Sequence, residues 1–272
     1  MIKGREWKQW ICFAAYFLST IAIAASTDNA TELAKKSQNP VENMVSVPFN
    51  NNFNFGYGPH DNTQYILDIK PVIPFTLNES LNLITRTIIP VVRQPNSYPN
   101  RDYINGFGDI NPSFFFSPAH PGQLIWGIGP TVVLPTATNK QIGQGKYSVG
   151  PSFVALTITK TWVIGFLTFN AWSVAGDANR QNVNEFELQY FINYNFPHGW
   201  YITSSPIITA DWTAKAKDRW TVPFGLGGGH VFDIGKQPVN VSVQAYDNVK
   251  TPANGGPDWQ LQLNVTLLFP ES

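Results

Sequence analysis

The chain has 272 residues and carries 18 basic and 18 acidic side chains, so its formal net charge is zero. A neutral chain offers no electrostatic case for a nucleic-acid partner or for a polybasic membrane patch. Charged residues make up only 13% of the chain, about half the usual share, while aromatic residues reach 14%. This combination is unusual for a soluble domain.

The first residues have the pattern of a secretory signal peptide. A basic start is followed by the apolar stretch WICFAAYFLSTIAIA, from Trp10 to Ala24, which ends in small residues. The alternative is an uncleaved anchor. Cys12 is the only cysteine and lies inside this stretch, so the mature chain can form neither a disulfide nor a thiolate metal site. We expect export, with a signal peptide at residues 1–24.

Residues 25–42 differ from everything that follows them. The stretch TDNATELAKKSQNP has helix-forming residues after a Thr/Asp/Asn cluster, and Pro40 ends it. We expect a short helix or a disordered tail, either in the periplasm or as a plug in or below the lumen of a barrel.

From residue 43 to residue 272 the chain alternates between apolar and polar residues. DWQLQLNVTLLF and NEFELQYFINYNF each place one kind of residue on each face, with Phe191 the exception in the second. Successive side chains of a strand point to opposite faces, so each segment has an apolar and a polar side. Twelve segments follow the pattern: residues 43–55, 63–76, 81–93, 106–117, 123–135, 146–158, 162–174, 184–196, 200–212, 220–234, 238–249 and 258–269.

The connections between these segments alternate in length. LNES, PAHPG, TKT, PHG and GKQP are short, and the connections between them are mostly longer and rich in Gly, Asn and Lys. No stretch of 18 apolar residues follows residue 25, so a membrane would be crossed by strands. The sequence therefore predicts an all-β fold, a transmembrane antiparallel β-barrel of about twelve strands with short periplasmic turns and longer extracellular loops. Aromatic residues are expected near the strand ends.

The stretch TVPFGLGGGHVFDIG, at residues 221–235, has the glycine content of a phosphate-binding loop. A dinucleotide loop would need Gly where this chain has His230, and no Lys-Ser/Thr pair follows the glycines. We interpret the stretch as a barrel strand with a nearly bare lumen face. Such a face permits a bend or the close approach of another segment inside the barrel.

Three prolines share a local pattern in consecutive predicted strands. Pro112, Pro130 and Pro151 occur in DINPSF, GIGPTV and SVGPSF, and each proline removes a ladder hydrogen bond. We expect a row of bulges or kinks in one wall. Such a row is either a structural bend or a weak seam that opens sideways to the membrane.

Catalysis is not expected. A hydrolase needs a nucleophile beside a general base, and none of the four histidines has a serine in such a setting. His60 beside Asp61 is too small a set for a metal site, and His230 falls on the lipid-facing side of its strand. We predict no catalytic residue, no metal and no cofactor. A lipid-modifying enzyme remains an alternative if a Ser or carboxylate reaches His60.

The polar residues on the inner face are the candidate site. Charged groups inside a membrane are costly unless they pair or meet water, so they either form a network that fills the barrel or line a passage. The predicted pore-lining residues are Asp68, Lys70, Arg86, Glu185, Glu187, Gln189, Asn193, Gln244, Tyr246, Gln260, Gln262 and Asn264.

Several blocks of the chain resemble a Gram-negative outer-membrane family. They are QNPVENMVSVPFNNNFNFGYGP, LDIKPVIPFTLNESLNLITRTIIPVV, GFGDINPSFFFSP, WGIGPTVVLPTAT and GQGKYSVGPSFVAL. The family is linked to transport in the meta-cleavage pathway of phenol degradation, and its members are often mislabelled neuromedin U. The resemblance runs from about residue 35 to Phe269. It implies an outer-membrane barrel that passes small aromatic or hydrophobic compounds, and it defines no functional residues.

One departure concerns the end of the chain. Outer-membrane barrels often end on Phe, which the barrel assembly machinery reads, whereas here Phe269 is followed by three further residues. The expected partners are outer-membrane lipid, the assembly machinery and a small-molecule substrate, with no nucleic acid.

We therefore predict an outer-membrane channel for passive passage of small, aromatic or hydrophobic molecules. The alternative from another class is a closed structural or surface-binding barrel that acts through its extracellular loops, around residues 95–105 and 136–146. A soluble periplasmic sandwich is a further alternative, in which the mature protein would stay soluble without detergent.

Overall fold

The computed structural model describes residues 27–58, 60–96, 102–253 and 255–270. The predicted signal peptide at residues 1–24 lies outside the described residues. One helix of more than one turn is described, α2 (Thr27–Ser37), together with the short 3-10 turn η1 (Pro197–Gly199). Within the described ranges no helix is both long enough and apolar enough to span a membrane.

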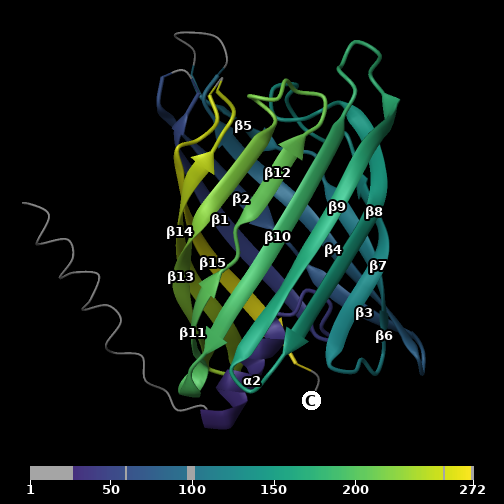
Figure 1. Cartoon of the computed structure of the whole chain (residues 1–272), viewed down its shortest axis with the longest axis vertical. Helices are drawn as coiled ribbons and strands as arrows, with labels where there is room; N and C mark the ends of the chain where they lie inside the picture. The colour runs from purple at the N-terminus through teal and green to yellow at the C-terminus, as the bar shows by residue number, and fades with distance from the viewer. Residues whose placement is uncertain (1–26, 59, 97–101, 254, 271–272) are drawn as a thin grey trace, which may run out of the picture.

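The rest of the described chain is mainly strand, and the strands close into a barrel (Figure 1). The strands are β1 (Val45–Tyr57), β2 (Asn62–Ile69), β3 (Val72–Asn78), β4 (Leu81–Gln94), β5 (Ile104–Phe107), β6 (Asn111–Pro118), β7 (Leu124–Val133), β8 (Lys146–Ile158), β9 (Trp162–Gly176), β10 (Asn184–Asn195), β11 (Trp200–Ser204), β12 (Ile207–Asp211), β13 (Trp220–Ile234), β14 (Gln237–Lys250) and β15 (Trp259–Phe269).

These fifteen segments form twelve barrel strands. Each of the pairs β2 with β3, β5 with β6 and β11 with β12 occupies one place between the same neighbours, so fifteen segments less three gives twelve. Every ladder is antiparallel, β1 pairs with β15, and β9 pairs with β10 to complete the ring. The predicted closed antiparallel barrel of about twelve strands is confirmed.

Three of the twelve barrel strands are interrupted, between β2 and β3, between β5 and β6 and between β11 and β12. Two of these interruptions coincide with prolines that lie inside the predicted strand segments. Pro71 follows Lys70 between β2 and β3, and Pro206 follows Ser205 between β11 and β12. Proline has no N–H to give to a ladder, so the strand cannot pair continuously through these points.

The outer face of the barrel is apolar. Phe224 and Leu226, on the face of β13 opposite Gly225, Gly227 and Gly229, are 67% and 64% exposed. Aromatic pairs stand near both rims: Phe55 stacks on Trp259, and Trp200 stacks on His230, each with ring centroids 4.0 Å apart. An exposed apolar surface bordered by aromatic rings is the pattern of a barrel that spans lipid. His230 faces outward as predicted, and its ring stacks on Trp200 and Phe232.

Two prolines of the predicted row lie opposite each other, but the ladders have no register shift at Pro112, Pro130 or Pro151, so the predicted bulges are not found there. Pro130 of β7 lies opposite Pro151 of β8. Between β6 and β7 the described ladder has two partner pairs, Ser113 with Thr131 and Phe116 with Ile128. The ladder between β6 and β7 is therefore sparse, whereas β7 and β8 pair continuously from Leu124 to Val133.

Helix α2 lies across the end of the barrel that carries the short turns (Figure 1). The Gly199 N–H donates to Thr31 Oγ1 at 3.2 Å, and Asn240 Nδ2 donates to Ser37 Oγ at 2.8 Å. Two basic residues lie in its last turn, where cations suit the helix dipole. Its apolar side joins a buried cluster with the ends of the wall strands: Leu33, Ala34, Met44, Tyr201, Val231 and Leu268.

Candidate functional site

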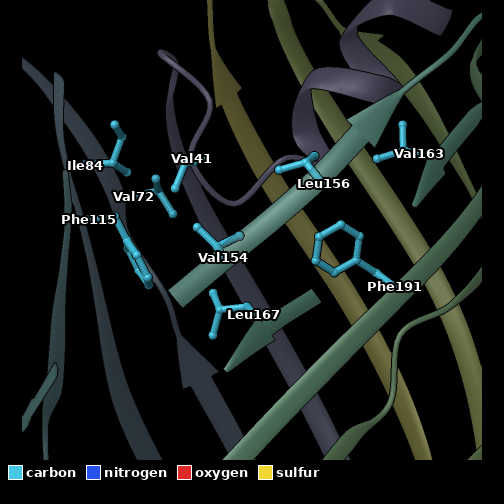
Figure 2. Close-up of a cluster of buried hydrophobic side chains, with 9 residues drawn as sticks. All are labelled: Val41, Val72, Ile84, Phe115, Val154, Leu156, Val163, Leu167 and Phe191. Carbon is cyan, nitrogen blue, oxygen red and sulfur yellow. The ribbon is translucent and has the colours of Figure 1, made fainter. Parts of the chain in front are cut away.

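The chain enters the lumen directly after helix α2. Val41 is 5% exposed and its side chain meets inward-facing apolar residues of the wall, as Figure 2 shows. These wall residues come from β3, β4, β6, β8, β9 and β10, which form one side of the barrel. The cluster around Val41 consists of Val72, Ile84, Phe115, Val154, Leu156, Val163, Leu167 and Phe191.

This cluster differs from the expectation of a polar lumen face. The apolar patch is stable inside the barrel because Val41 and the neighbouring side chains cover it and keep it from water. Phe191 was the exception to the alternation in its segment, and this position inside the cluster is its physical reason. The sequence did not predict that Val41 covers this patch, because Val41 precedes the first strand and is not part of the alternating pattern.

The other side of the lumen is polar and contains a cavity of about 180 Å³. The cavity lies between the wall and the segment Ser37–Pro40, and Lys70 and Arg86 are its two charged lining residues. Its uncharged polar lining comes mainly from β1, β10, β11, β14 and β15. These residues are Ser46, Asn50, Gln189, Asn193, Thr203, Ser205, Asn240, Ser242, Gln244, Asn264 and Thr266.

Four charged residues inside the barrel, Asp68, Lys70, Arg86 and Glu187, form one group. Lys70 Nζ lies 3.3 Å from Asp68 Oδ2. Arg86, on β4, interacts electrostatically with Asp68 and with Glu187 of β10, although β4 and β10 are not neighbours in the barrel. Glu187 Oε1 is buried without a hydrogen-bond partner. The group therefore bridges the lumen between two separate parts of the wall.

A belt of hydrogen-bonded side chains continues from this group around the inner wall. Asn52 Nδ2 donates to Asp68 Oδ2 at 3.2 Å, and Gln262 Nε2 donates to Asn52 Oδ1 at 2.7 Å. Gln244 Nε2 donates to Gln262 Oε1 at 3.2 Å, and Ser205 Oγ donates to Gln244 Oε1 at 2.9 Å. The belt links β2, β1, β15, β14 and the break between β11 and β12. Mutual hydrogen bonding satisfies polar groups that would otherwise be costly to bury.

The glycines of β13 make the last link of the belt possible. Gly225 and Gly227 pair with Tyr246 and Gln244 of β14. Ser205 reaches past β13 to both of these residues, and its N–H donates to Tyr246 Oη at 3.1 Å. A Cβ on either glycine would overlap a carbonyl oxygen of β14. The glycine stretch is thus a strand with a bare inner face over which another segment closely approaches, as predicted.

A second hollow lies toward the end of the barrel that carries the long loops, and its lining contains four carboxylates and Arg219. Glu185 and Glu187 line this hollow of about 340 Å³. Arg180 donates to the carbonyl oxygens of Gln144, Lys140 and Gly143. It thereby ties the loop after β9 to the loop after β7.

The structure places the twelve predicted residues on the inner wall or at its rim. Lys70, Arg86, Gln189, Asn193, Gln244 and Asn264 line the cavity, whereas Glu185 and Glu187 line the second hollow. Asp68, Tyr246 and Gln262 belong to the polar belt. Gln260 is the remaining one and lies opposite Asn54 and Tyr246.

The histidines are spread over the molecule. His198 is in the turn η1, His230 is on the outer face, and His60 and His120 are exposed in connections. Among the described residues, no three His, Cys, Asp or Glu side chains converge to hold a metal ion.

Comparison with solved structures places the fold among outer-membrane proteins. The crystal structure of an outer membrane channel from Pseudomonas putida F1 matches with a TM-score of 0.60 at 14% identity, covering 83% of this chain and 94% of that one. The outer membrane phospholipase dimer of Salmonella typhi with bound calcium gives a TM-score of 0.46 at 11% identity, covering 91% of this chain and 99% of that one. At such identities the likeness concerns the fold alone.

A comparison with curated proteins gives no significant match. A family match, in contrast, covers residues 46–265, which is nearly the whole barrel. The chain therefore belongs to the family described as "Putative MetA-pathway of phenol degradation".

Proposed function

We propose that the protein is a channel of the bacterial outer membrane through which small molecules pass passively, without catalysis or cofactor. The observation that carries this proposal is the lumen, where a closed barrel with an apolar outer face encloses a polar cavity with two buried cations. Buried charges in a membrane-spanning wall are costly and commonly mark a path for polar molecules.

Export through the signal peptide at residues 1–24, and insertion by the barrel assembly machinery into outer-membrane lipid, are parts of this proposal. The apolar outer face and the aromatic rim pairs support the lipid environment. The family to which the chain belongs supports small aromatic or hydrophobic molecules as cargo.

Residues 25–42 act in this proposal as a plug. Helix α2 covers the periplasmic end, and Val41 is inserted into an apolar patch of the wall. Apolar contacts and hydrogen bonds, such as the one from Asn240 to Ser37, hold the segment in place without a covalent cross-link, so the segment can leave the lumen. The passage is then closed at rest and opens when the plug moves.

A sideways exit is a second candidate route for apolar cargo. The observation that favours it is the sparse ladder between β6 and β7, beside the opposed prolines of β7 and β8. The apolar cluster inside the lumen includes Phe115 of β6, so apolar cargo would find a matching surface next to this wall.

The competing function is a closed barrel that binds partners through its extracellular loops. The contacts of Arg180, which order the loop at residues 136–146, favour it. An enzyme that modifies lipid would instead require a serine or carboxylate beside His60, which is an exposed loop residue.

Planar-bilayer recording of the protein purified in detergent tests the proposal, together with liposome uptake of small aromatic compounds. Steady or gated conductance is expected, and replacing Arg86 should change its ion selectivity. Uptake of aromatic compounds without ion conductance would favour the sideways route. Absence of both conductance and uptake, for the intact chain and for a chain lacking residues 26–42, would overturn the channel and leave the loops as the functional part.

A further inference from the structure

The lining of the cavity beside Lys70 and Arg86 contains positive side chains and no negative ones. Both cations form part of its lining and are 4% and 8% exposed, whereas its lining includes no Asp or Glu. Asp68 and Glu187 interact with the two cations from outside the cavity lining. Buried cationic donors that border an open space favour an anion in it, because charge-assisted hydrogen bonds are strong away from water. Lys70 and Arg86 are therefore the charged groups that reach the cavity itself, and both offer hydrogen-bond donors to an anionic group there.

The remainder of the lining sets the size and character of the ligand body. Val72, Leu167 and Phe191 border the cavity and belong to the apolar cluster of the wall. A cavity of about 150 Å³ is known to hold one benzene molecule, and this one measures about 180 Å³. The space thus matches a single six-membered ring that carries one small polar group.

Both proline breaks of the wall meet at this cavity. Lys70 precedes Pro71 in the break of β2 and β3, and Ser205 precedes Pro206 in the break of β11 and β12. Lys70 and Ser205 both line the space. Interruptions of a ladder turn side chains away from the regular alternation and are frequent beside binding sites. Two separate interruptions at one cavity indicate a site whose lining is set by the strand geometry.

We propose that this cavity binds a small organic carboxylate whose body is about one six-membered ring. Arg86 would bind the carboxylate in a two-pronged manner and Lys70 would add a second cation, while the ring lies against Phe191 and Leu167. The segment Ser37–Pro40 closes the cavity toward the periplasm. This inference rests on the proposed channel function, because the cavity lies on the path through the lumen.

Calorimetric titration of the detergent-purified protein with benzoate and with benzamide tests the site. The two probes share a ring and differ in charge, so benzoate should bind at least about tenfold more tightly. Lys70→Gln and Arg86→Gln should each weaken benzoate binding by a similar factor. Lys146→Gln is the matched control, because Lys146 is also 8% exposed but lies outside the cavity lining, at the start of β8.

Arg86→Gln removes a cation that faces Glu187, so Arg86→Lys serves as a second variant. It keeps the charge and loses the two-pronged geometry, and it should weaken benzoate binding several-fold while the heat-modifiable band of the folded barrel is retained. Equal affinity for benzoate and benzamide would overturn the site. An unchanged benzoate affinity in Lys70→Gln and Arg86→Lys, or no benzoate binding by the wild type, would do so as well.

The result separates the site from the channel. Calorimetry needs no transport, so benzoate binding by a protein that is silent in bilayers and liposomes would refute the channel and keep the site. Conductance without benzoate binding would overturn the site alone.

Discussion

Removing two methyl groups from Val41 tests whether the N-terminal segment closes the barrel. Val41 is 5% exposed and contacts the apolar cluster inside the lumen. Val41→Ala loses two buried carbon groups at about 0.8 kcal/mol each, and the space left behind raises the loss to about 2 kcal/mol. If this contact holds the plug, the ratio of released to docked plug rises about thirtyfold, since about 1.4 kcal/mol corresponds to a factor of ten.

The assay is the open fraction of single channels in planar bilayers, measured for the wild type and for Val41→Ala. Val174→Ala removes the same atoms from a side chain that is 66% exposed on the outer face of β9, so it should leave the open fraction unchanged. An open fraction in Val41→Ala equal to that of the wild type, in a protein that still folds, would refute the reasoning. The closure would then lie in the charged group of Lys70, Arg86 and Glu187.

The remaining predictions concern the wall and the loops. Gly227→Ala places a Cβ against a backbone carbonyl of β14 and should reduce the fraction of folded, heat-modifiable barrel. Gly122 has open space around it, so Gly122→Ala should leave that fraction unchanged. Equal folding of the two variants would contradict the close approach of β13 and β14. Arg180→Ala removes the donors that hold three loop carbonyls, so protease should cut residues 139–145 faster than in the wild type, and an unchanged cutting rate would show that other contacts order the loop. The backbone N–H of Asn179 donates a hydrogen bond to the Asp177 carboxylate and lowers the pKa of that carboxyl group. The stabilisation of the loop by this hydrogen bond is therefore fully present above the ordinary pKa of Asp, and it is lost as the pH falls through the lowered pKa of Asp177. A carboxyl NMR titration should give a midpoint below the ordinary value that moves up in Asn179→Pro, and an ordinary midpoint in the wild type would contradict it.

Much of the barrel could be predicted because its cause is local. Alternation with a period of two fixes which residues share a face. The apolar outer face of β13, with Phe224 and Leu226, follows directly from this alternation. The alternation of short and long connections fixes antiparallel neighbours. The predicted segments at residues 146–158 and 220–234 coincide with β8 and β13.

The breaks in the strands could be predicted only in part. Each proline signals a lost hydrogen bond, but whether the strand bends, bulges or ends depends on the neighbours it would have paired with. Pro71 and Pro206 stand at real interruptions, whereas Pro130 and Pro151 lie within β7 and β8. The difference is a property of the ladders, which the sequence of one strand does not contain.

The sequence by itself determined the barrel and, through the period-two alternation, the polar inward set around Lys70 and Arg86. It could not determine which inward residues interact across the lumen, because Arg86 and Glu187 come within electrostatic range only when strands far apart in the chain close into a ring. The place of Val41 was likewise decided by the tertiary structure. An apolar residue before the first strand has no periodic partner in the sequence, and its burial depends on an apolar patch that six different strands assemble.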